Sequence, residues 1–357
     1  MVEKTRLVLL EGFLGSGKTT LMLEIGRRLA ARGKKAGYIT NDQGAYLVDT
    51  AFALSEGSAV AEVTGSCFCC NFPALIDNIA KLKESHDPDI IIAEAVGSCT
   101  DLGATVVLPL QERHGDSIEV VGYYVAVDGG RLPDEYSIRM NLLDPRSPKE
   151  TLIAHQIKEA VNLLITKSDS LDEEDLAAGR QLLSRINPRA RIRACSARDG
   201  SGVEELLDEI LAGRETRIEA MVPLDYAVYA RAEAEYGWYN GQWEEANDAD
   251  DWDGFLRSLA AKLDSEIAHA KLLVESEGRR LKVSLVGERI ERDLAGGSGH
   301  SGPIKVTLNV RARCSPERIV PAVEALIGRR QVSRYRHEAL IPAPPSPTFR
   351  VQRERVG

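Results

Sequence analysis

The sequence contains no long apolar run, and this shortage excludes a chain that crosses a membrane by helices. Its longest apolar stretches, such as Ile90–Ala93 and Val120–Val127, are far too short to span a bilayer. A secretory signal is also missing, because Leu7–Leu10 leads at once into a glycine-rich segment and no cleavage-site pattern follows. We therefore expect a cytoplasmic protein without a membrane partner.

Positive charge is in short supply. The 45 lysines and arginines are outnumbered by 54 aspartates and glutamates, which leaves a formal net charge of −9. Nucleic-acid binders usually carry a basic patch, so no nucleic-acid partner is expected. Hydrophobic residues (43%) and charged residues (28%) are balanced as in globular proteins, and 357 residues suit two domains rather than one.

Cysteine is scarce overall but locally concentrated. Six cysteines in a cytoplasmic chain of this length do not indicate a disulfide framework. Three of them, Cys67, Cys69 and Cys70, nevertheless fall within four residues. Such close clustering rarely arises by chance and indicates a specific role for the three thiols.

The first part of the chain alternates short apolar runs with helical patterns. Strands are expected at Thr5–Glu11, Lys35–Thr40, Asp89–Glu94, Ile118–Val127, Val161–Thr166 and Ala190–Cys195. Helices are expected at Thr19–Arg32, Pro73–Ser85, Pro148–Ala160, Glu173–Ile186 and Val203–Leu211. This alternation predicts an α/β fold with a doubly wound, mostly parallel sheet over residues 1–215.

The pattern changes after residues 214–223. Residues 222–341 are expected to form a smaller α+β domain, either ferredoxin-like or similar to the C-terminal domain of the family named below. Helices are predicted at Trp252–Ile267 and Pro316–Ile327, and strands at Ala270–Glu275, Leu281–Val286 and Ile304–Arg311. Residues 342–357 are rich in proline and are expected to form a loose tail.

A phosphate-binding motif stands between the first strand and the first helix. Residues 12–19 read Gly-Phe-Leu-Gly-Ser-Gly-Lys-Thr and fit the pattern G-x-x-x-x-G-K-[ST]. Glycines let successive N–H groups point at a phosphate, Lys18 brings a positive charge, and Thr19 offers a hydroxyl to Mg²⁺. The expected nucleotide-contacting residues are Gly12, Gly15, Ser16, Gly17, Lys18, Thr19 and Thr20. The fold is therefore predicted to be that of a P-loop NTPase.

Two later segments favour guanine as the base. Thr166-Lys167-Ser168-Asp169 ends a predicted strand, and the Asp169 carboxylate can accept hydrogen bonds from both N1–H and N2–H of guanine, a donor pair that adenine lacks. Lys167 can lay its stem along the base. Ser196 and Ala197 follow the next strand, where a backbone N–H could meet the guanine oxygen. Thr166 stands where Asn is usual, so strict choice of GTP over ATP stays open.

A third segment suits the terminal phosphate. Glu94 ends a predicted strand, and Gly97 follows three residues later. An acid in this position can hold Mg²⁺ through water, and a glycine N–H can contact the γ-phosphate and move when that phosphate leaves. We therefore expect Lys18, Glu94 and Gly97 to act in hydrolysis. A solvated acid at a strand end is the plain alternative.

The cysteine cluster suits a soft metal ion. The thiolates of Cys67, Cys69 and Cys70 would supply most of a tetrahedral shell for Zn²⁺, and less typically for Co²⁺ or Ni²⁺. Small buried core residues and a redox switch are the alternatives. Asp42, in the turn Asn41-Asp42-Gln43-Gly44, could ligate Mg²⁺ or the transition metal, although a plain acidic turn is equally consistent with the sequence.

Together these motifs resemble the CobW-type GTPases, relatives of HypB and UreG. The resemblance covers roughly Lys4 to Leu211, and it is carried by residues 12–20, by Cys-x-Cys-Cys at 67–70, by Glu94-x-x-Gly97, and by Asn41–Gly44 with Asp49. It departs from the family in having Gly65-Ser66 before the first cysteine, Thr166 in place of Asn, and no histidine-rich tract. The resemblance implies a GTP-hydrolysing metallochaperone that delivers zinc, cobalt or nickel to a client metalloenzyme or cofactor-pathway protein.

Two functional hypotheses follow. In the first, GTP and Mg²⁺ order the segments around residues 41–49 and 94–97, and this ordering shapes the cysteine loop to hold a metal. In the second, the protein is a GTP-gated assembly factor for a cofactor enzyme, such as a corrinoid enzyme, and the cysteines are structural. The aromatic run Tyr236–Trp243 would then be a docking surface, although core packing is the commoner role. A nucleotide-dependent homodimer is a further expectation.

Overall fold

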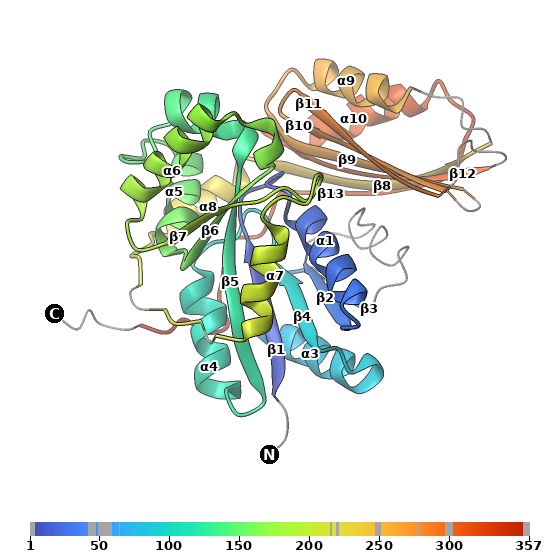
Figure 1. Cartoon of the computed structure of the whole chain (residues 1–357). Coiled ribbons are helices and arrows are strands. Elements are labelled where there is room, and N and C mark those ends of the chain that lie inside the picture. The colour runs from blue at the N-terminus through green and yellow to red at the C-terminus, as the bar shows by residue number, and fades with distance from the viewer. Residues whose placement is uncertain are drawn as a thin grey trace. The chain divides into compact units, whose positions relative to one another are not determined.

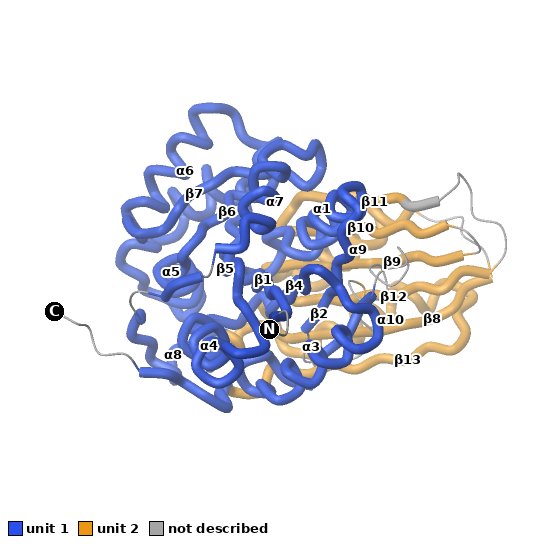
Figure 2. Tube along the Cα trace, turned by 60° about the horizontal axis from the view of Figure 1, so that its bottom comes forward, with its two compact units in different colours: residues 1–42, 58–232, 345–357 blue, residues 43–57, 233–344 orange. Residues whose placement is uncertain are grey.

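The computed structural model describes residues 4–41, 48, 59–63, 65–214, 216–218, 221–246, 251–276, 279–296 and 303–352. The chain divides into two compact units, coloured separately in Figure 2. Unit 1 comprises residues 1–42, 58–232 and 345–357, and unit 2 comprises residues 43–57 and 233–344. This division differs from the sequence expectation, because the C-terminal residues from 345 belong with unit 1 rather than forming a separate tail.

Unit 1 is built on a seven-stranded parallel sheet in the order β3-β2-β4-β1-β5-β6-β7 (Figure 1). Its strands are mostly buried apolar runs, as a sheet covered on both faces requires. They are β1 (Thr5–Glu11), β2 (Ala36–Asn41), β3 (Ala59–Val63), β4 (Ile90–Glu94), β5 (Ile118–Asp128), β6 (Asn162–Thr166) and β7 (Arg191–Ala194). The doubly wound α/β prediction is confirmed.

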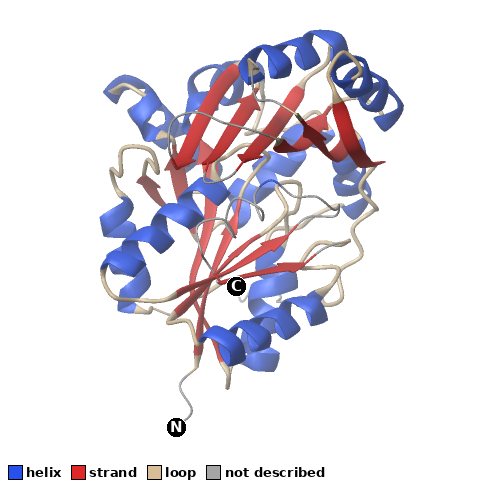
Figure 3. Ribbon diagram, turned by 90° about the vertical axis from the view of Figure 1, so that its right-hand side faces the viewer, coloured by secondary structure: helices blue, strands red, loops and turns tan. Residues whose placement is uncertain are grey.

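Helices lie on both faces of this sheet (Figure 3), and α1 packs against α7. The longer helices are α1 (Lys18–Ala31), α3 (Phe72–His86), α4 (Leu108–His114), α5 (Pro148–Glu159), α6 (Glu173–Ile186), α7 (Val203–Ala212) and α8 (Tyr226–Ala234). Side-chain caps determine where several of these helices begin. Ser147 and Glu150 form a capping box at α5, Asp172 caps α6, and Asn71 caps α3.

Short irregular helices follow the strands that carry the site. They are two π-helices, η1 (Gly103–Val107) and η3 (Leu132–Arg139), and two 3₁₀ turns, η2 (Gly129–Arg131) and η4 (Ser168–Ser170). Helices of these types often mark functional segments. None of them has the long 3.6-residue periodicity that allowed α1, α3, α5, α6 and α7 to be predicted. The short helices α4 and α8 were also not predicted.

Unit 2 is an antiparallel six-stranded sheet in the order β11-β10-β9-β12-β8-β13. Its strands are β8 (Gly237–Glu245), β9 (Ile267–Ser276), β10 (Arg279–Val286), β11 (Arg289–Gly296), β12 (Ile304–Ala312) and β13 (Val332–Leu340). The helices α9 (Trp252–Leu263) and α10 (Pro316–Ile327) pack together over the sheet (Figure 1). An α+β second domain is confirmed.

The aromatic run that could have formed a docking surface lies in the core of unit 2. Trp238, Tyr239 and Trp243 on β8 are at most 1% exposed, and Tyr236 just before the strand is also buried. Tyr239 and Trp243 belong to the apolar cluster between the sheet and the two helices. The docking interpretation of Tyr236–Trp243 is therefore wrong, because these side chains are not at the surface.

The helix predicted at Trp252–Ile267 is shorter than expected. Helix α9 ends at Leu263 because Asp264 adopts a left-handed conformation (φ 43°), and Ile267 already begins β9. Within the described ranges, no helix combines the length and the apolar character that crossing a bilayer requires.

Candidate functional site

The phosphate-binding loop connects β1 to α1. Gly12, Gly15 and Gly17 have φ values of 138°, 82° and 83°, a region that favours glycine, so the motif's glycines match the backbone path. Lys18 is buried, and its Nζ donates to the Gly12 carbonyl over 2.7 Å, which directs the amine across its own loop. Ser16 Oγ is buried and finds no hydrogen-bond partner within the described part of the chain. A buried polar atom of this kind inside a curled glycine loop fits a phosphate ligand.

Two further predicted residues meet at the start of α1. Thr19 Oγ1 donates to Glu94 Oε1 over 2.9 Å, which links the loop to the carboxyl end of β4. Thr20 follows in the first turn of the helix and is partly exposed. A hydroxyl and a carboxylate in contact form the oxygen donor set that Mg²⁺ prefers, so these residues fit the ion expected from the motif.

Gly97 lies against the backbone of the phosphate loop. A Cβ added at Gly97 would stand 2.9 Å from the amide N and 3.0 Å from the Cα of Leu14, so no larger residue fits without displacing that loop. The turn after β4 therefore lies directly against the phosphate loop.

The segment after β6 braces the same loop. Thr166 Oγ1 donates to the Ser16 carbonyl over 2.7 Å. Thr166 stands where Asn is usual in the family, and this contact shows that the threonine supports the phosphate loop. Lys167, in a left-handed conformation, donates from Nζ to Gly15 O (2.9 Å) and to Asp128 Oδ2 (3.2 Å). Asp128, at the end of β5 and 1% exposed, was missed by the sequence reasoning, although an acid ending a long apolar strand was a usable signal.

Asp169 is oriented by the loop that follows β7. Ser196 Oγ donates to Asp169 Oδ1 over 2.6 Å, and the Ser168 amide donates to the Cys195 carbonyl over 3.2 Å. The Ser196 oxygen also accepts from the amides of Arg198 and Asp199, which fixes the turn that contains Ala197. The two segments predicted to read the base thus lie together at the carboxyl ends of β6 and β7.

The three clustered cysteines occupy a tight turn before α3. The amides of Cys70 and Asn71 both donate to the Cys67 carbonyl, over 3.1 and 2.9 Å. Cys67 and Cys69 are buried, whereas Cys70 is partly exposed. The Sγ atoms of Cys67 and Cys69 are 2.9 Å apart, and those of Cys69 and Cys70 are 3.7 Å apart. The turn therefore brings the three thiols together.

Asn41, the last residue of β2, holds this turn in place. Its Nδ2 donates to the carbonyls of Val63 (2.9 Å) and Ser66 (2.7 Å), and its Oδ1 accepts from the amide of Phe68 (2.9 Å). The cysteine turn is thus fixed to the carboxyl end of β2, where the sequence had placed a nucleotide-dependent segment. Asp42, Gln43, Gly44 and Asp49, which were predicted as part of that segment, lie outside the described residues.

A fourth thiol, which the sequence reasoning missed, joins the cluster. Cys99 is fully buried in the turn after β4, and ligand atoms of Cys67, Cys69 and Cys99 all lie within 4.8 Å of one another. All six cysteines are described, and none forms a disulfide. A single cysteine far from the Cys-x-Cys-Cys run carries no signal of its own in the sequence.

Hydrogen bonds among the thiols shift their pKa values in opposite directions. Hydrogen bonds from Cys69, Cys70 and Cys99 lower the pKa of the Cys67 thiol well below its usual range, despite burial. The hydrogen bond with Cys67 raises the pKa of Cys69, and it also raises the pKa of Cys70 to about 11. One thiolate stabilised by neighbouring S–H groups is a nucleophilic and metal-binding arrangement, since the thiolate is the ligand form.

The turn that carries Cys99 is held from α5. Gln156 Nε2 donates to the Cys99 carbonyl over 2.6 Å, and Glu159 accepts from Thr100 Oγ1 (2.7 Å) and from the Gly103 amide (3.0 Å). The Glu159 pKa is lowered because its hydrogen bonds with His155, Thr100 and Gly103 outweigh the effect of burial. The position of the Cys99 thiol is therefore set by a buried polar network.

The C-terminal segment lies against the cysteine turn, in contrast to the loose tail that we expected. Ser346 N–H donates to Cys70 Sγ over 3.1 Å, and Thr348 N–H donates to the Cys69 carbonyl over 2.8 Å. Phe349 packs edge-on against Phe72, and Arg350 Nε pairs with the buried Asp101 carboxylate over 2.6 Å.

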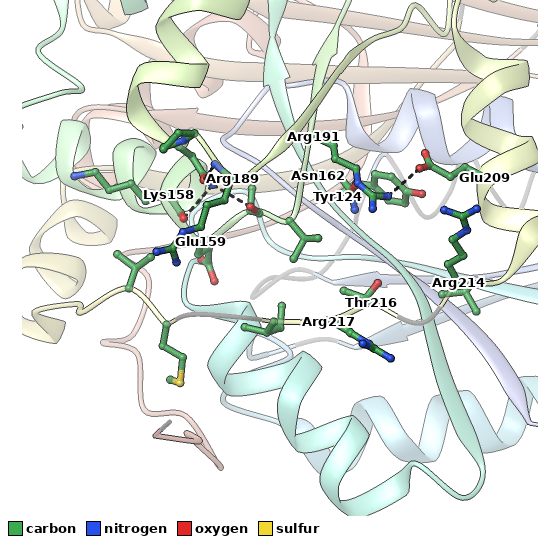
Figure 4. Close-up of a pocket in the computed structure, with 18 of the residues that line it drawn as sticks. Tyr124, Lys158, Glu159, Asn162, Arg189, Arg191, Glu209, Arg214, Thr216 and Arg217 are labelled. Carbon is green, nitrogen blue, oxygen red and sulfur yellow. Dashed lines mark hydrogen bonds and ion pairs between the residues drawn. The ribbon is translucent and has the colours of Figure 1, made fainter. Parts of the chain in front are cut away.

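A separate cavity of about 820 Å³ opens at the amino ends of β6 and β7 (Figure 4). Its wall carries five basic residues and two acids, and Arg191 pairs with Glu209 over 3.6 Å. The basic residues are Lys158, Arg189, Arg191, Arg214 and Arg217. Ligands of open parallel sheets bind at the carboxyl ends of the strands, so this cavity is not the nucleotide site.

The loop between β1 and α1, with Lys18 at its end and Glu94 against Thr19, defines a P-loop nucleotidase. Residues 6–194 match the CobW/HypB/UreG nucleotide-binding domain, and the chain belongs to that family. It is a GTPase of the CobW/HypB/UreG type, as the resemblance at residues 12–20, 67–70 and 94–97 had predicted.

Individual relatives differ in how much of the chain they cover. "Zinc chaperone CobW" of Sinorhizobium sp. is 28% identical over 325 residues, which are 81% of this chain and 87% of that protein. "Zinc-regulated GTPase metalloprotein activator 1" of Dictyostelium discoideum is 26% identical over 218 residues, or 53% and 45% of the two chains.

Two solved structures are also similar to this chain. Zn(II)-bound YjiA GTPase from E. coli (16% identity, TM-score 0.39) covers 92% of this chain and 100% of its own. HypB from Helicobacter pylori in complex with nickel (16% identity, TM-score 0.42) covers 60% of this chain and 91% of its own.

Proposed function

We infer that this GTPase is a metallochaperone: it binds a soft transition-metal ion as cargo through cysteine thiolates and uses the state of the nucleotide to control release to a client protein. The observation that carries the proposal is the thiol cluster on the turns that follow β3 and β4. Strand β4 pairs with β1, the strand that leads into the phosphate loop. The printed names of the relatives, which include zinc chaperones and a GTPase metalloprotein activator, favour zinc as the cargo.

The nucleotide half of the cycle is assigned to unit 1. Amide groups of residues 12–19 and the Lys18 amine bind the β- and γ-phosphates, and Asp169 accepts the two N–H groups of guanine. Thr19 and Glu94 would hold Mg²⁺, which supplies neutralisation of phosphate charge when bound. The Gly97 N–H would contact the γ-phosphate, and hydrolysis of GTP by water gives GDP and inorganic phosphate.

In the proposed cycle, the metal ion is bound by the thiols clustered around Cys67. Thiolate sulfur favours Zn²⁺ and also accepts Co²⁺ and Ni²⁺, whereas it is a poor ligand for Mg²⁺. Hydrogen bonds from the neighbouring thiols lower the pKa of Cys67, which favours its thiolate, the form that binds a metal. Binding of the metal then displaces the remaining thiol protons, so metal affinity should rise with pH.

The coupling between the two halves passes through backbone contacts. Asn41 ties the cysteine turn to the end of β2, and Gly97 presses the turn after β4 against the phosphate loop. A change at the γ-phosphate that moves either segment also moves the thiols. The alternative function, a GTP-gated assembly factor with structural cysteines, lacks its expected docking surface because Trp238, Tyr239 and Trp243 are buried in the core.

The proposal is tested by purifying the protein under anaerobic conditions and measuring bound metals by elemental analysis, with and without a non-hydrolysable GTP analogue. We expect close to one Zn²⁺ per chain, with an occupancy that depends on the nucleotide. The double variant Cys67→Ser/Cys69→Ser should lose the metal and keep GTP binding. A protein that takes up no Zn²⁺, Co²⁺ or Ni²⁺ in either state is not a metal carrier.

A further inference from the structure

Four thiols gather around one point in unit 1, but they come from two different segments. Cys67, Cys69 and Cys70 belong to the turn before α3, and Cys99 belongs to the turn after β4. The buried members are Cys67, Cys69 and Cys99, whose ligand atoms lie within 4.8 Å of one another. The buried group is therefore not the same set as the three cysteines of the Cys-x-Cys-Cys run.

The spacing of the buried thiols suits one tetrahedral ion. A Zn–S bond of about 2.3 Å places two thiolates of a tetrahedral site about 3.8 Å apart. The separation of 2.9 Å between Cys67 and Cys69, and the upper limit of 4.8 Å for the whole group, lie within about 1 Å of that value. Side-chain rotations, without a change of fold, would bring all three sulfurs onto a common ion.

Cys70 stands apart from this group in exposure and in contacts. It is partly exposed, and its sulfur accepts a hydrogen bond from the Ser346 amide of the C-terminal segment. Its sulfur nevertheless lies 3.7 Å from that of Cys69, so Cys70 stands at the partly exposed edge of the buried group. A tetrahedral ion held by the three buried thiols would have its fourth position available to Cys70 or to an exchanging ligand.

Ordinary core packing does not account well for Cys99. Free cysteines are often buried as small apolar residues. The neighbours of Cys99 in its turn are instead Ser98, Thr100 and Asp101, all buried, and α5 fixes the Cys99 carbonyl through Gln156. The turn is thus built as a polar, positioned element, and its one thiol is directed at two other thiols.

We propose that Cys99 is a resident metal ligand together with Cys67 and Cys69, so that the bound ion links the cysteine turn directly to the turn that follows β4. This rests on the proposed function and specifies how it works. Cys99 comes two residues after Gly97, whose backbone lies against the phosphate loop. A metal held by Cys99 is therefore sensitive to movement of the segment that contacts the γ-phosphate.

The test compares zinc affinities of the full chain by anaerobic competition with a chelating dye. Cys99→Ser and Cys99→Ala should each weaken Zn²⁺ binding by more than about 100-fold, beyond the ~10–100-fold loss typical of removing an outer-shell partner. Cys314→Ser, which alters a cysteine of unit 2, is the matched control and should bind zinc as the unaltered chain does. Correct folding is checked by the affinity for a GTP analogue without metal, which both Cys99 variants should retain.

A second readout counts the thiolates. With Co²⁺ in place of Zn²⁺, the thiolate-to-cobalt absorption of the Cys99 variants should fall by about a third, since one of three sulfur ligands is gone. If Cys67→Ser abolishes metal binding but both Cys99 variants bind with unaltered affinity and absorption, the inference is overturned and the proposed function stands. If the unaltered chain binds none of the three metals, the proposed function fails as well.

Discussion

The hydroxyl of Thr19 donates a hydrogen bond to a carboxylate oxygen of Glu94 over 2.9 Å, so that the first turn of α1 and the end of β4 share one polar contact. These two oxygen donors are the expected protein side of a Mg²⁺ site. The contact brings together two motifs that are far apart in the sequence.

Glu94→Ala should lower kcat for GTP hydrolysis by about 100-fold, as expected for loss of one positioned electrostatic group. It should also raise the Mg²⁺ concentration needed for half-maximal activity. Phosphate release measured across a Mg²⁺ series checks both effects. Glu119→Ala is the control, because Glu119 lies at the amino end of β5, away from the phosphate loop. This variant should leave kcat and the Mg²⁺ requirement unaltered. An unaltered Mg²⁺ requirement in Glu94→Ala would remove this residue from the metal's surroundings.

Asp169→Asn should change the preferred base. Loss of two charge-assisted hydrogen bonds, each contributing about 1.5–3 kcal/mol, should weaken GTP binding by at least about 100-fold. Xanthine carries a carbonyl where guanine has its amino group, so the new amide can donate to it and xanthosine triphosphate should bind better than GTP. Fluorescent nucleotide titrations measure this reversal, with Asp172→Asn, at the exposed cap of α6, as control. Equal GTP affinity in Asp169→Asn would mean that the base lies elsewhere.

Asn41→Asp should loosen the cysteine turn. The substitution keeps an acceptor for the Phe68 amide but removes the donor that contacts Val63 O and Ser66 O. Two buried carbonyls would then face a carboxylate, and we expect unfolding free energy to fall by about 1–3 kcal/mol. Zinc affinity should fall as well.

Asn78→Asp is the matched control for this change, because Asn78 donates a single bond from α3 to the Glu62 carbonyl. Chemical denaturation measures the unfolding free energy of both variants, and zinc titration measures their zinc affinity. Should Asn78→Asp lower zinc affinity as much as Asn41→Asp, the effect would be one of general stability and not of the cysteine turn.

Glu11→Gln should stabilise the protein, and increasingly so as pH rises. Burial, together with the charge of Glu159, raises the pKa of Glu11 well above its ordinary value. The folded state therefore keeps a proton that the unfolded state releases, so the contribution of Glu11 to stability is present below pH ~4.5 and is lost as pH rises toward the folded-state pKa. Glutamine does not titrate and should escape this loss.

Thermal unfolding of Glu11→Gln and the unaltered chain between pH 5 and pH 8 checks this expectation. The difference in stability in favour of the variant should widen toward pH 8. A difference that narrows with rising pH would mean that Glu11 is ionised in the folded protein.

Most of unit 1 could be predicted from its sequence because its strands are continuous apolar runs and its helices have clear periodicity and caps. Strand β3 was missed since Ala59–Val63 is short and contains a glutamate, and it borders residues outside the described ranges. In unit 2, β8 was not recognised because glycines and polar residues interrupt its aromatic positions, and β13 was missed because it is polar and mostly exposed. Cross-strand pairing, which determines both strands, is not a local property of the sequence.

The site was predictable where the chemistry is local and was not where it depends on the fold. Residues 12–19 and the run at Cys67–Cys70 are contiguous motifs with a known chemical purpose. Cys99, Asn41 and Ser346 contribute only because three distant segments converge on the cysteine turn. The proline-rich composition of the C-terminal segment predicted a loose tail, and it carried no information about the contacts of Phe349 with Phe72 and of Arg350 with Asp101.

The central claim is that nucleotide and metal affinities depend on each other, and it is tested most directly by measuring the affinity for a GTP analogue with and without bound Zn²⁺. The account predicts that zinc tightens GTP binding by the same factor as GTP tightens zinc binding, on the order of 5–150-fold for a coupling of about 1–3 kcal/mol. Cys67→Ser should abolish the effect. A GTP affinity that stays the same with Zn²⁺, Co²⁺ and Ni²⁺ would contradict the account.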